Sequence, residues 1–376
     1  MLFHLVEWLK QFFSPVNALG YVTTRILAST LTSMVLTFIL SPWFIRRLKD
    51  RQIGQVVRDD GPKSHLSKAG TPTMGGSLIL FAVVISTLLW CNLTNGFIWI
   101  VLTLSVGYGV VGFLDDSLKI SKKNSKGLSA LAKFGLQMAL GLAAAYYLFS
   151  SDLMDPAIRL RLDLPLTNFY THDISLPLYV YVIFATLVVV GASNAVNLTD
   201  GLDGLAIGPV IISAFVFLLL TYIIGSSIVV YTNKFDSTIL ARYLLIPHVP
   251  GAEELSIYCG AVIGAGVGFL WFNTYPASVF MGDVGSLSLG GGLGAVAVVT
   301  KTELVLFVVG GIFVMEAVSV ILQVAYFKFT GKRIFLMAPI HHHFEKKGWA
   351  EPKVIVRFWI ISIMLALVGL AMVKAR

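Results

Sequence analysis

The stretch LAIGPVIISAFVFLLLTYIIG, residues 205–225, contains no charged side chain. An α-helix rises about 1.5 Å per residue, so about 20 apolar residues in a row cross the roughly 30 Å hydrocarbon core of a bilayer. In lipid a single segment must satisfy its own backbone hydrogen bonds, and the α-helix does so. The stretch therefore predicts a membrane-spanning helix, and it decides the class of the fold.

Comparable apolar runs occur along the whole sequence. Of the 376 residues, 56% are hydrophobic and 13% are charged, whereas a soluble domain carries roughly a quarter charged residues. We predict an all-α polytopic membrane protein, a bundle of about ten transmembrane helices that forms one integral membrane domain over residues 1–376. The predicted spans are 22–44, 74–91, 96–114, 130–149, 178–196, 203–225, 256–272, 285–300, 303–327 and 354–373.

The basic residues are unevenly divided between the two ends of these spans. One end carries most of them, in the connections after the first, third and ninth spans. They are Arg46, Arg47, Lys49, Arg51, Arg58, Lys63, Lys68, Lys119, Lys122, Lys123, Lys126, Lys328, Lys332, Arg333, Lys346, Lys347 and Lys353. The positive-inside rule puts these connections in the cytoplasm and both chain termini in the periplasm. The net charge of +8 is then a signal of topology, and we expect no nucleic-acid partner.

Dense clusters of Asp, Asn, His and Gly all lie on the predicted cytoplasmic face. The first is GPKSHLSKAGTPTMGG, residues 61–76, with Lys68 and Thr73. A glycine-rich loop of this kind can bind phosphate through backbone N–H groups and a lysine point charge. It matches no Walker pattern, and a solvated basic loop before a span remains an alternative.

The third predicted span ends in GFLDDSLKI, residues 112–120, which contains Asp115 and Asp116. Two adjacent carboxylates repel each other, and the C-terminus of a helix disfavours anions. The pair therefore needs a compensating charge, and a bound cation would supply it. A charged stop at the interface, with Lys119 as its partner, is the alternative.

The fifth predicted span runs into SNAVNLTDGLDGL, residues 193–205. Asn197, Asp200 and Asp203 recur every three residues, and the intervening glycines indicate a broken helix whose backbone lines a cavity. Oxygen ligands at this density suit a nucleotide or a hard cation such as Mg²⁺. A turn that only caps two helices is the alternative.

A single acid, Asp283, occurs in NTYPASVFMGDVGSLSLGG, residues 273–291, three residues after Phe280. Glycines flank it where a span begins, so it is either a functional carboxylate or an N-cap.

The last cluster is APIHHHFEKKGW, residues 338–349. Three consecutive histidines cannot all face one metal from a helix, so they are better donors to phosphate or sugar oxygens than zinc ligands. Acids for a hard cation and bases for phosphate, gathered on one face, predict metal-assisted phosphoryl transfer at a membrane surface.

Five strings carry a resemblance to a known family over essentially the whole chain. They are GTPTMGG (70–76), FLDDSLK (113–119), NAVNLTDGLDGL (194–205), FMGDVGS (280–286) and APIHHHFEKKGW (338–349). With them the sequence resembles the polyprenyl-phosphate N-acetylhexosamine-1-phosphate transferases. The last string is similar to the muramoyl-pentapeptide branch of that family.

The resemblance implies an Mg²⁺-dependent enzyme of the bacterial inner membrane, with its active site facing the cytoplasm. It would transfer phospho-N-acetylmuramoyl-pentapeptide from the UDP-linked donor to undecaprenyl phosphate, releasing UMP and forming the first lipid-linked precursor of peptidoglycan. The branch that uses UDP-N-acetylglucosamine, or a secondary transporter, is the alternative function. Transporters place their polar site near the bilayer midplane, whereas these clusters lie at one interface. A homodimer is left open.

The resemblance also assigns residues. Asp115, Asp116 and Asp283 would bind the metal and take part in catalysis, together with His341. Phe280 would offer a face to the uracil ring. The residues implied in substrate binding are Lys68, Thr73, Asn197, Asp200, Asp203, Phe280, Gln323, His341, His342 and His343.

A lipid phosphate, whose second pKa is about 6, is largely dianionic at pH 7 and hardly needs a base. Direct displacement is therefore favoured over a covalent phosphosugar intermediate.

Overall fold

The computed structural model describes residues 1–12, 14–51, 68, 70–122, 127–172, 174–233 and 236–374. Lys63 of the predicted phosphate loop lies outside them, as do the basic residues Arg58, Lys123 and Lys126. Among the described residues, nine helices are long and apolar enough to cross a membrane. They are α2 (Val22–Asp50), α4 (Gly96–Ser121), α5 (Ala130–Ser150), α6 (Leu178–Thr199), α7 (Ile207–Gly225), α9 (Glu254–Asn273), α10 (Gly282–Val299), α12 (Gly311–Thr330) and α14 (Glu351–Lys374).

The second predicted span, 74–91, is the shorter helix α3 (Gly76–Trp90). Every predicted span is thus helical, and the ninth, 303–327, is divided between two helices. The remaining elements are small. They are α1 (Leu2–Leu9), η1 (Ser14–Gly20), β1 (Val229–Asn233), β2 (Asp236–Ile239), α8 (Leu240–Tyr243), α11 (Glu303–Val309) and α13 (Ile340–Lys346). The strands β1 and β2 pair as one antiparallel hairpin. The expected all-α membrane fold is confirmed.

The centre of the bundle is α10, which packs against α3, α4, α6 and α7. Its small residues allow this close packing, and all of its residues from Val284 to Val299 are buried. On α4, a Cβ at Gly112 would come within 2.3 Å of the carbonyl oxygen of Asp283. The two backbones therefore touch at the point where α10 begins, and this contact fixes the spacing of the polar groups there.

The glycine-rich stretch 260–268 of α9 packs inside the bundle, against α2. A Cβ at Gly264 would come within 2.0 Å of the carbonyl oxygen of Thr30. Where both helices begin, the Arg25 guanidinium donates to both carboxylate oxygens of Glu254, at 2.8 and 2.6 Å. Within this chain, the small residues serve helix packing and not a free surface.

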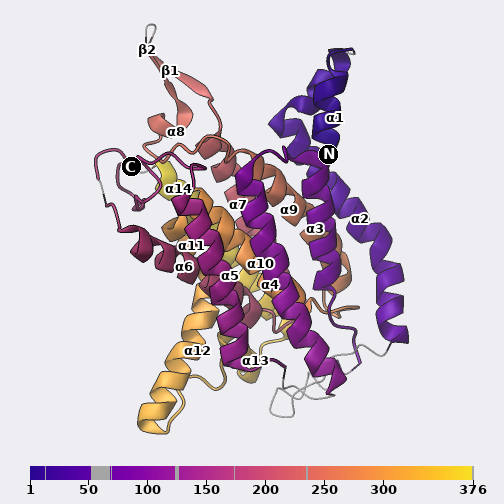
Figure 1. The fold of residues 1–376 in the computed structure, drawn as a ribbon. Coiled ribbons are helices and arrows are strands. Elements are labelled where there is room, and N and C mark those ends of the chain that lie inside the picture. Colours follow the sequence, from indigo (N-terminus) through magenta and orange to yellow (C-terminus); the bar gives the residue numbers. More distant parts are fainter. Residues whose placement is uncertain are drawn as a thin grey trace.

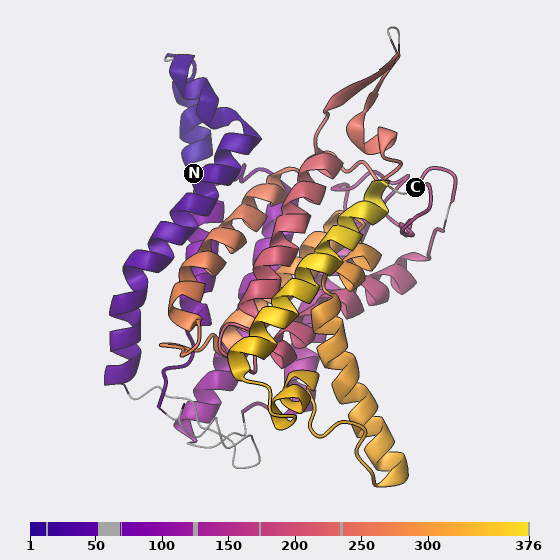
Figure 2. The same cartoon turned by 180° about the vertical axis from the view of Figure 1, so that it is seen from behind.

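Two breaks interrupt the helical spans. The chain leaves the helix at Asp200, as the glycines of residues 201–204 predict, and re-enters one at Ile207. The ninth predicted span, 303–327, is divided at Gly310 into α11 and α12. This second break was not predicted, because apolar residues surround it on both sides. It allows α12 to lean away from the bundle (Figure 2).

Both marked chain ends lie at the same end of the bundle as the β1–β2 hairpin (Figure 1). The helix α13 and the far end of α12 lie at the opposite end. Asp283 belongs to this opposite end, because its backbone N–H donates to Asp116 Oδ2 near the C-terminal end of α4, which reaches that end in Figure 1. By the sequence, this is the end that carries most of the basic residues.

Candidate active site

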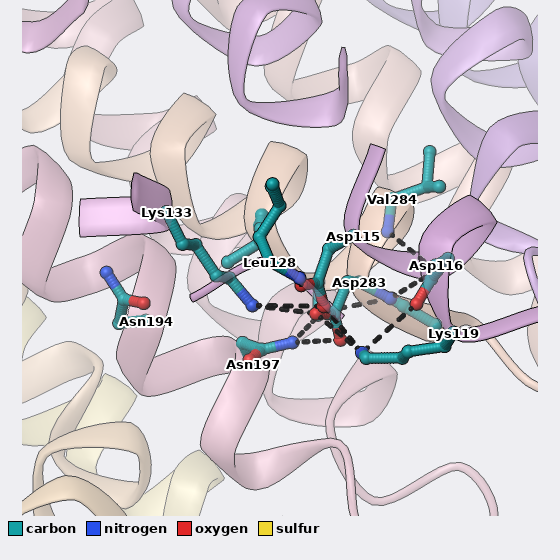
Figure 3. A network of polar contacts seen from close by, with 12 residues as sticks. Asp115, Asp116, Lys119, Leu128, Lys133, Asn194, Asn197, Asp283 and Val284 are labelled. Carbon is teal, nitrogen blue, oxygen red and sulfur yellow. Dashed lines mark hydrogen bonds and ion pairs between the residues drawn. The ribbon is translucent and has the colours of Figure 1, made fainter. Parts of the chain in front are cut away.

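Three carboxylates meet at one end of the bundle. Asp115 and Asp116 come from α4, and Asp283 is the second residue of α10. Each offers a ligand oxygen, and these oxygens lie within 4.8 Å of one another. Figure 3 shows the group from close by. The sequence predicted these acids, but α4 continues to Ser121, so Asp115 and Asp116 lie inside the helix and not at its end.

Two lysines neutralise part of this negative charge. Lys119 Nζ lies 2.6 Å from Asp115 Oδ2 and 3.0 Å from Asp283 Oδ2. Lys133 Nζ lies 2.7 Å from the same Asp283 oxygen and 3.8 Å from Asp115 Oδ2. The sequence named Lys119 as a partner of the acids only in the alternative of a charged stop at the interface. Lys133 was missed, because it lies in the first turn of α5, inside a predicted span, with no polar neighbour that marks it.

Hydrogen bonds hold each carboxylate in place. The backbone N–H of Asp283 donates to Asp116 Oδ2 at 2.8 Å, so an acid of α4 accepts from the positive N-terminus of α10. The backbone N–H of Leu128 donates to Asp115 Oδ1 at 2.7 Å. Asn197 Nδ2 donates to Asp283 Oδ1 at 2.9 Å. The three acids are thus oriented by the backbone and by Asn197 as well as by the lysines.

The donor set fits a hard divalent cation. Carboxylate oxygens are the ligands that such cations prefer. When all five side chains are ionised, the three carboxylates and two ammonium groups carry one net negative charge, which a cation would offset. Of the described residues, Asp115, Asp116 and Asp283 form the one group of His, Cys, Asp or Glu side chains close enough together to hold a metal ion.

A second polar group surrounds Lys68. Its Nζ lies 2.7 Å from Asp203 Oδ1 and 2.5 Å from Glu351 Oε1. The backbone N–H of Asp203 also donates to Glu351 Oε1, at 3.0 Å. Lys68 and Asp203 were predicted as site residues, whereas Glu351 was not. It follows the histidine string and is the first residue of α14, so its position after APIHHHFEKKGW was the available signal.

The break after α6 connects the two groups. Asp203 belongs to the lysine group, and Asp200 lies beside the carboxylates. Burial and the negative charges of Asp283 and Asp116 raise the pKa of Asp200 to about 8. Thr73 lies close to Gly282, the residue before Asp283, since a Cβ at Gly282 would come within 3.0 Å of the Thr73 hydroxyl.

The three histidines have three different partners. His341 is fully buried, and its Nδ1 lies 3.1 Å from Glu316 Oε1. His342 Nδ1 lies 2.7 Å from Glu345 Oε2, and His343 Nδ1 accepts a hydrogen bond from the Leu336 backbone. The three rings do not converge on one point, as the sequence predicted.

Two further predicted residues contact the backbone of neighbouring loops. Gln323 Oε1 accepts from Ile334 N and Phe335 N, at 3.1 and 3.0 Å, and so fixes the chain after α12. The backbone of Phe280 donates to Pro72 O at 2.8 Å and accepts from Gly75 N. Phe280 therefore joins the glycine-rich loop before α3 to the segment before α10.

The fold and the site define a multi-pass membrane protein with a carboxylate and lysine cluster where its helices end. A sequence model of glycosyl transferase family 4 matches residues 98–301, and signature 1 of the phospho-N-acetylmuramoyl-pentapeptide-transferases matches residues 68–80. The chain belongs to glycosyl transferase family 4 and, within it, to the phospho-N-acetylmuramoyl-pentapeptide-transferases.

Three relatives carry that transferase name over their full length. The protein of Sorangium cellulosum (strain So ce56) is 58% identical over 379 residues, which cover 100% of this chain and 99% of the relative. The proteins of Desulfatibacillum aliphaticivorans and Syntrophus aciditrophicus (strain SB) are 54% and 51% identical, and the match covers 100% of both chains in each case.

Proposed function

We propose that this protein transfers phospho-N-acetylmuramoyl-pentapeptide from its UDP-linked donor to undecaprenyl phosphate. The products are UMP and lipid I, the first lipid-linked precursor of peptidoglycan, so the enzyme serves cell-wall biogenesis. The observation that carries the proposal is the cluster of Asp115, Asp116 and Asp283 at the end of a membrane bundle whose whole sequence matches transferases of this name.

The proposed metal is Mg²⁺, held by Asp283 together with Asp115 and Asp116. Three carboxylates arranged within 4.8 Å offer hard oxygen ligands, and Mg²⁺ commonly combines one or two carboxylates with phosphate oxygens. When bound, the ion would neutralise charge on the diphosphate of the donor.

The chain itself contributes charge and position. Lys119 and Lys133 keep positive charge beside the acids, where an anionic diphosphate must approach. Asn197 holds one oxygen of Asp283 and thereby orients the carboxylate. The acceptor phosphate is largely dianionic at neutral pH, since its second pKa is about 6. It can attack the sugar-side phosphorus directly, with UMP as leaving group, and no residue need act as a strong base.

The donor is proposed to lie between the carboxylates and the Lys68 group. Lys68 would bind the donor with Asp203, and Phe280 would stack on the uracil ring. Asp200, Asn197 and Thr73 line the path between the two groups, and His341 is assigned to the reaction centre. The remaining proposed substrate contacts are Gln323, His342 and His343. All of these residues come from one bundle, which supports a single transferase domain over residues 1–376.

The orientation is proposed from charge. Most of the lysines and arginines that the sequence assigns to the cytoplasm fall at the end of the bundle that holds the carboxylates. We infer that the active site faces the cytoplasm of the bacterial inner membrane and that both termini face the periplasm.

Radiolabel transfer in detergent tests the function. Purified protein with undecaprenyl phosphate and Mg²⁺ is given either UDP-N-acetylmuramoyl-pentapeptide or UDP-N-acetylglucosamine. We expect lipid-linked label from the muramoyl donor alone, loss of label in Asp283→Ala and on chelation by EDTA, and recovery when Mg²⁺ is restored. Asp152→Ala, which removes an exposed acid in the connection after α5, is the matched control and keeps wild-type activity.

Other outcomes discriminate the alternatives. Label from the glucosamine donor would assign the protein to the other branch, and label from neither donor would contradict the proposal. Exchange of labelled UMP into the donor without lipid phosphate would indicate a covalent intermediate and contradict direct displacement.

A further inference from the structure

The helix α12 carries a buried acid that the reaction described above does not use. The second half of α12, residues 321–330, is mostly exposed to the surroundings of the bundle, and Phe329 near its end is 89% exposed. It extends away from the other helices (Figure 2). Glu316, by contrast, is 0% exposed. An ionisable side chain inside an apolar span is costly to bury, so its presence points to a specific partner and to a function.

The partner is His341, in the first turn of α13. Its Nδ1 lies 3.1 Å from Glu316 Oε1, and both side chains are fully buried. Within the described ranges, neither carboxylate oxygen of Glu316 and neither ring nitrogen of His341 makes a hydrogen bond of good geometry. The imidazole is therefore the one polar group placed against this buried acid in the described part of the chain. The contact joins α12 to the histidine string, and no local sequence pattern predicts that Glu316 and His341 meet.

The other side of the His341 ring lies against the break after α6. A Cβ built on Gly201 would come within 2.3 Å of His341 Nε2. Gly201 follows Asp200, whose carboxylate interacts with the backbone N–H of Gly282, the residue before Asp283. A continuous set of contacts thus leads from Glu316 through His341 and the Asp200–Gly201 turn to the start of α10.

We propose that Glu316 is a positioning residue for the transfer reaction. Through the close contact with Nδ1, Glu316 fixes the orientation of the imidazole ring, and Nε2 is then directed at the Asp200–Gly201 turn. The ring supports this turn beside the carboxylate cluster. Glu316 itself touches no substrate, and its effect on activity passes through His341. The inference rests on the proposed function, because transfer is one of its two readouts.

A double-mutant cycle on kcat/KM for the nucleotide donor tests the coupling. We expect Glu316→Ala and His341→Ala each to lower kcat/KM at least tenfold. The double variant should be no worse than His341→Ala alone, because Glu316 has nothing left to position. Glu316→Gln, whose side chain has nearly the same shape and can still contact Nδ1, should retain more activity than Glu316→Ala.

A matched control separates this coupling from general damage. Glu303 is also a buried acid, and it accepts a hydrogen bond from the Tyr181 hydroxyl at the opposite end of the bundle. Glu303→Ala should lower the thermal midpoint of the protein. Any loss of kcat/KM that it causes should multiply with the loss caused by His341→Ala. If the effects of Glu316→Ala and His341→Ala multiply in the same way, or if Glu316→Ala is fully active, the proposal is wrong.

A second measurement needs no activity. Diethyl pyrocarbonate modifies accessible imidazoles, and mass spectrometry locates the product. In the wild-type protein His341 should react far more slowly than the half-buried His342 and His343, and it should lose this protection in Glu316→Ala but not in Glu303→Ala. Unchanged protection would contradict the proposal. A wild-type protein that shows the protection but transfers no label would contradict the proposed function instead.

Discussion

Lys133 Nζ lies 2.7 Å from Oδ2 of Asp283, and this ion pair joins the first turn of α5 to the first turn of α10 (Figure 3). The two residues are 150 positions apart in the sequence. The same ammonium group lies 3.8 Å from Asp115 Oδ2, so Lys133 contacts both helices that supply the carboxylates. It is as much a part of the cluster as the acids themselves.

Replacing Lys133 with alanine is expected to lower transfer by about tenfold to hundredfold. A hydrogen bond to a charged group is worth about 1.5–3 kcal/mol, and about 1.4 kcal/mol corresponds to a factor of ten. The measurement is the initial rate of label transfer at saturating Mg²⁺. Lys122→Ala removes an exposed lysine at the end of α4 and should keep the wild-type rate. Equal rates in the two variants would show that the Lys133 ion pair is not needed.

The position of Lys133 could not be predicted from the sequence, whereas the positions of the acids could. Asp115, Asp116 and Asp283 were predicted because acids beside apolar spans are unusual wherever they occur. Lys133 has no such local mark, and Glu351 has only its position after the histidine string; each gains its importance from a partner far along the chain. Lys68 and Glu351, for example, are 283 positions apart. Contacts of this kind depend on how the helices pack, which the sequence pattern does not specify.

The helices themselves were predictable to a greater degree. Span length and charge placed a helix at every predicted position, because the thickness of the bilayer constrains each span separately. The break at Gly310 was not visible, since glycines are common in spans that remain straight. The lean of α12 and the burial of Glu316 likewise required the structure.

The close contact of α4 and α10 gives a second prediction. In Gly112→Ala the new methyl group would overlap the backbone of Asp283, within 2.3 Å of its carbonyl oxygen, and the helices would have to separate. A displacement of about 1 Å at a reacting group can cost about a hundredfold in rate. We expect a loss of that order in kcat, measured by label transfer. Gly191→Ala, where a Cβ meets no atom within 4 Å, is the control and should be fully active. An active Gly112→Ala would mean that this spacing is not critical.

A third prediction concerns pH and the end of the bundle opposite the carboxylates. Lys301 lies in the turn between α10 and α11, and burial lowers the pKa of its ammonium group to about 8. Between pH 8 and about 10.4, the usual value, the unfolded chain holds this proton and the folded chain does not. The contribution of Lys301 to stability therefore rises with pH in that window.

Thermal midpoints of the wild type and Lys301→Met in detergent, at pH 7.5 and pH 9.5, test this sign. The midpoint of the wild type minus that of the variant should increase at the higher pH. A difference that stays constant, or that decreases, would contradict a lowered pKa for Lys301.

The last prediction concerns Lys68, which two carboxylates hold at once. Its Nζ lies 2.7 Å from Asp203 Oδ1 and 2.5 Å from Glu351 Oε1, so the ammonium group has a fixed position before any donor arrives. If Lys68 binds the nucleotide donor, Lys68→Ala should raise the KM for the donor about tenfold or more. Glu351→Ala should raise it less, because Lys68 keeps Asp203 as a partner.

The KM for undecaprenyl phosphate serves as the internal reference. It should change less than twofold in both variants, since the lipid phosphate is proposed to approach the carboxylates and not the Lys68 group. Lys353→Ala, which removes an exposed lysine from the same first turn of α14, should leave both KM values unchanged. If Lys68→Ala raised the KM for the lipid and not for the donor, Lys68 would belong to the acceptor site. Glu351 touches Lys68 and not the carboxylate cluster. In that case Glu351→Ala should also raise the KM for undecaprenyl phosphate.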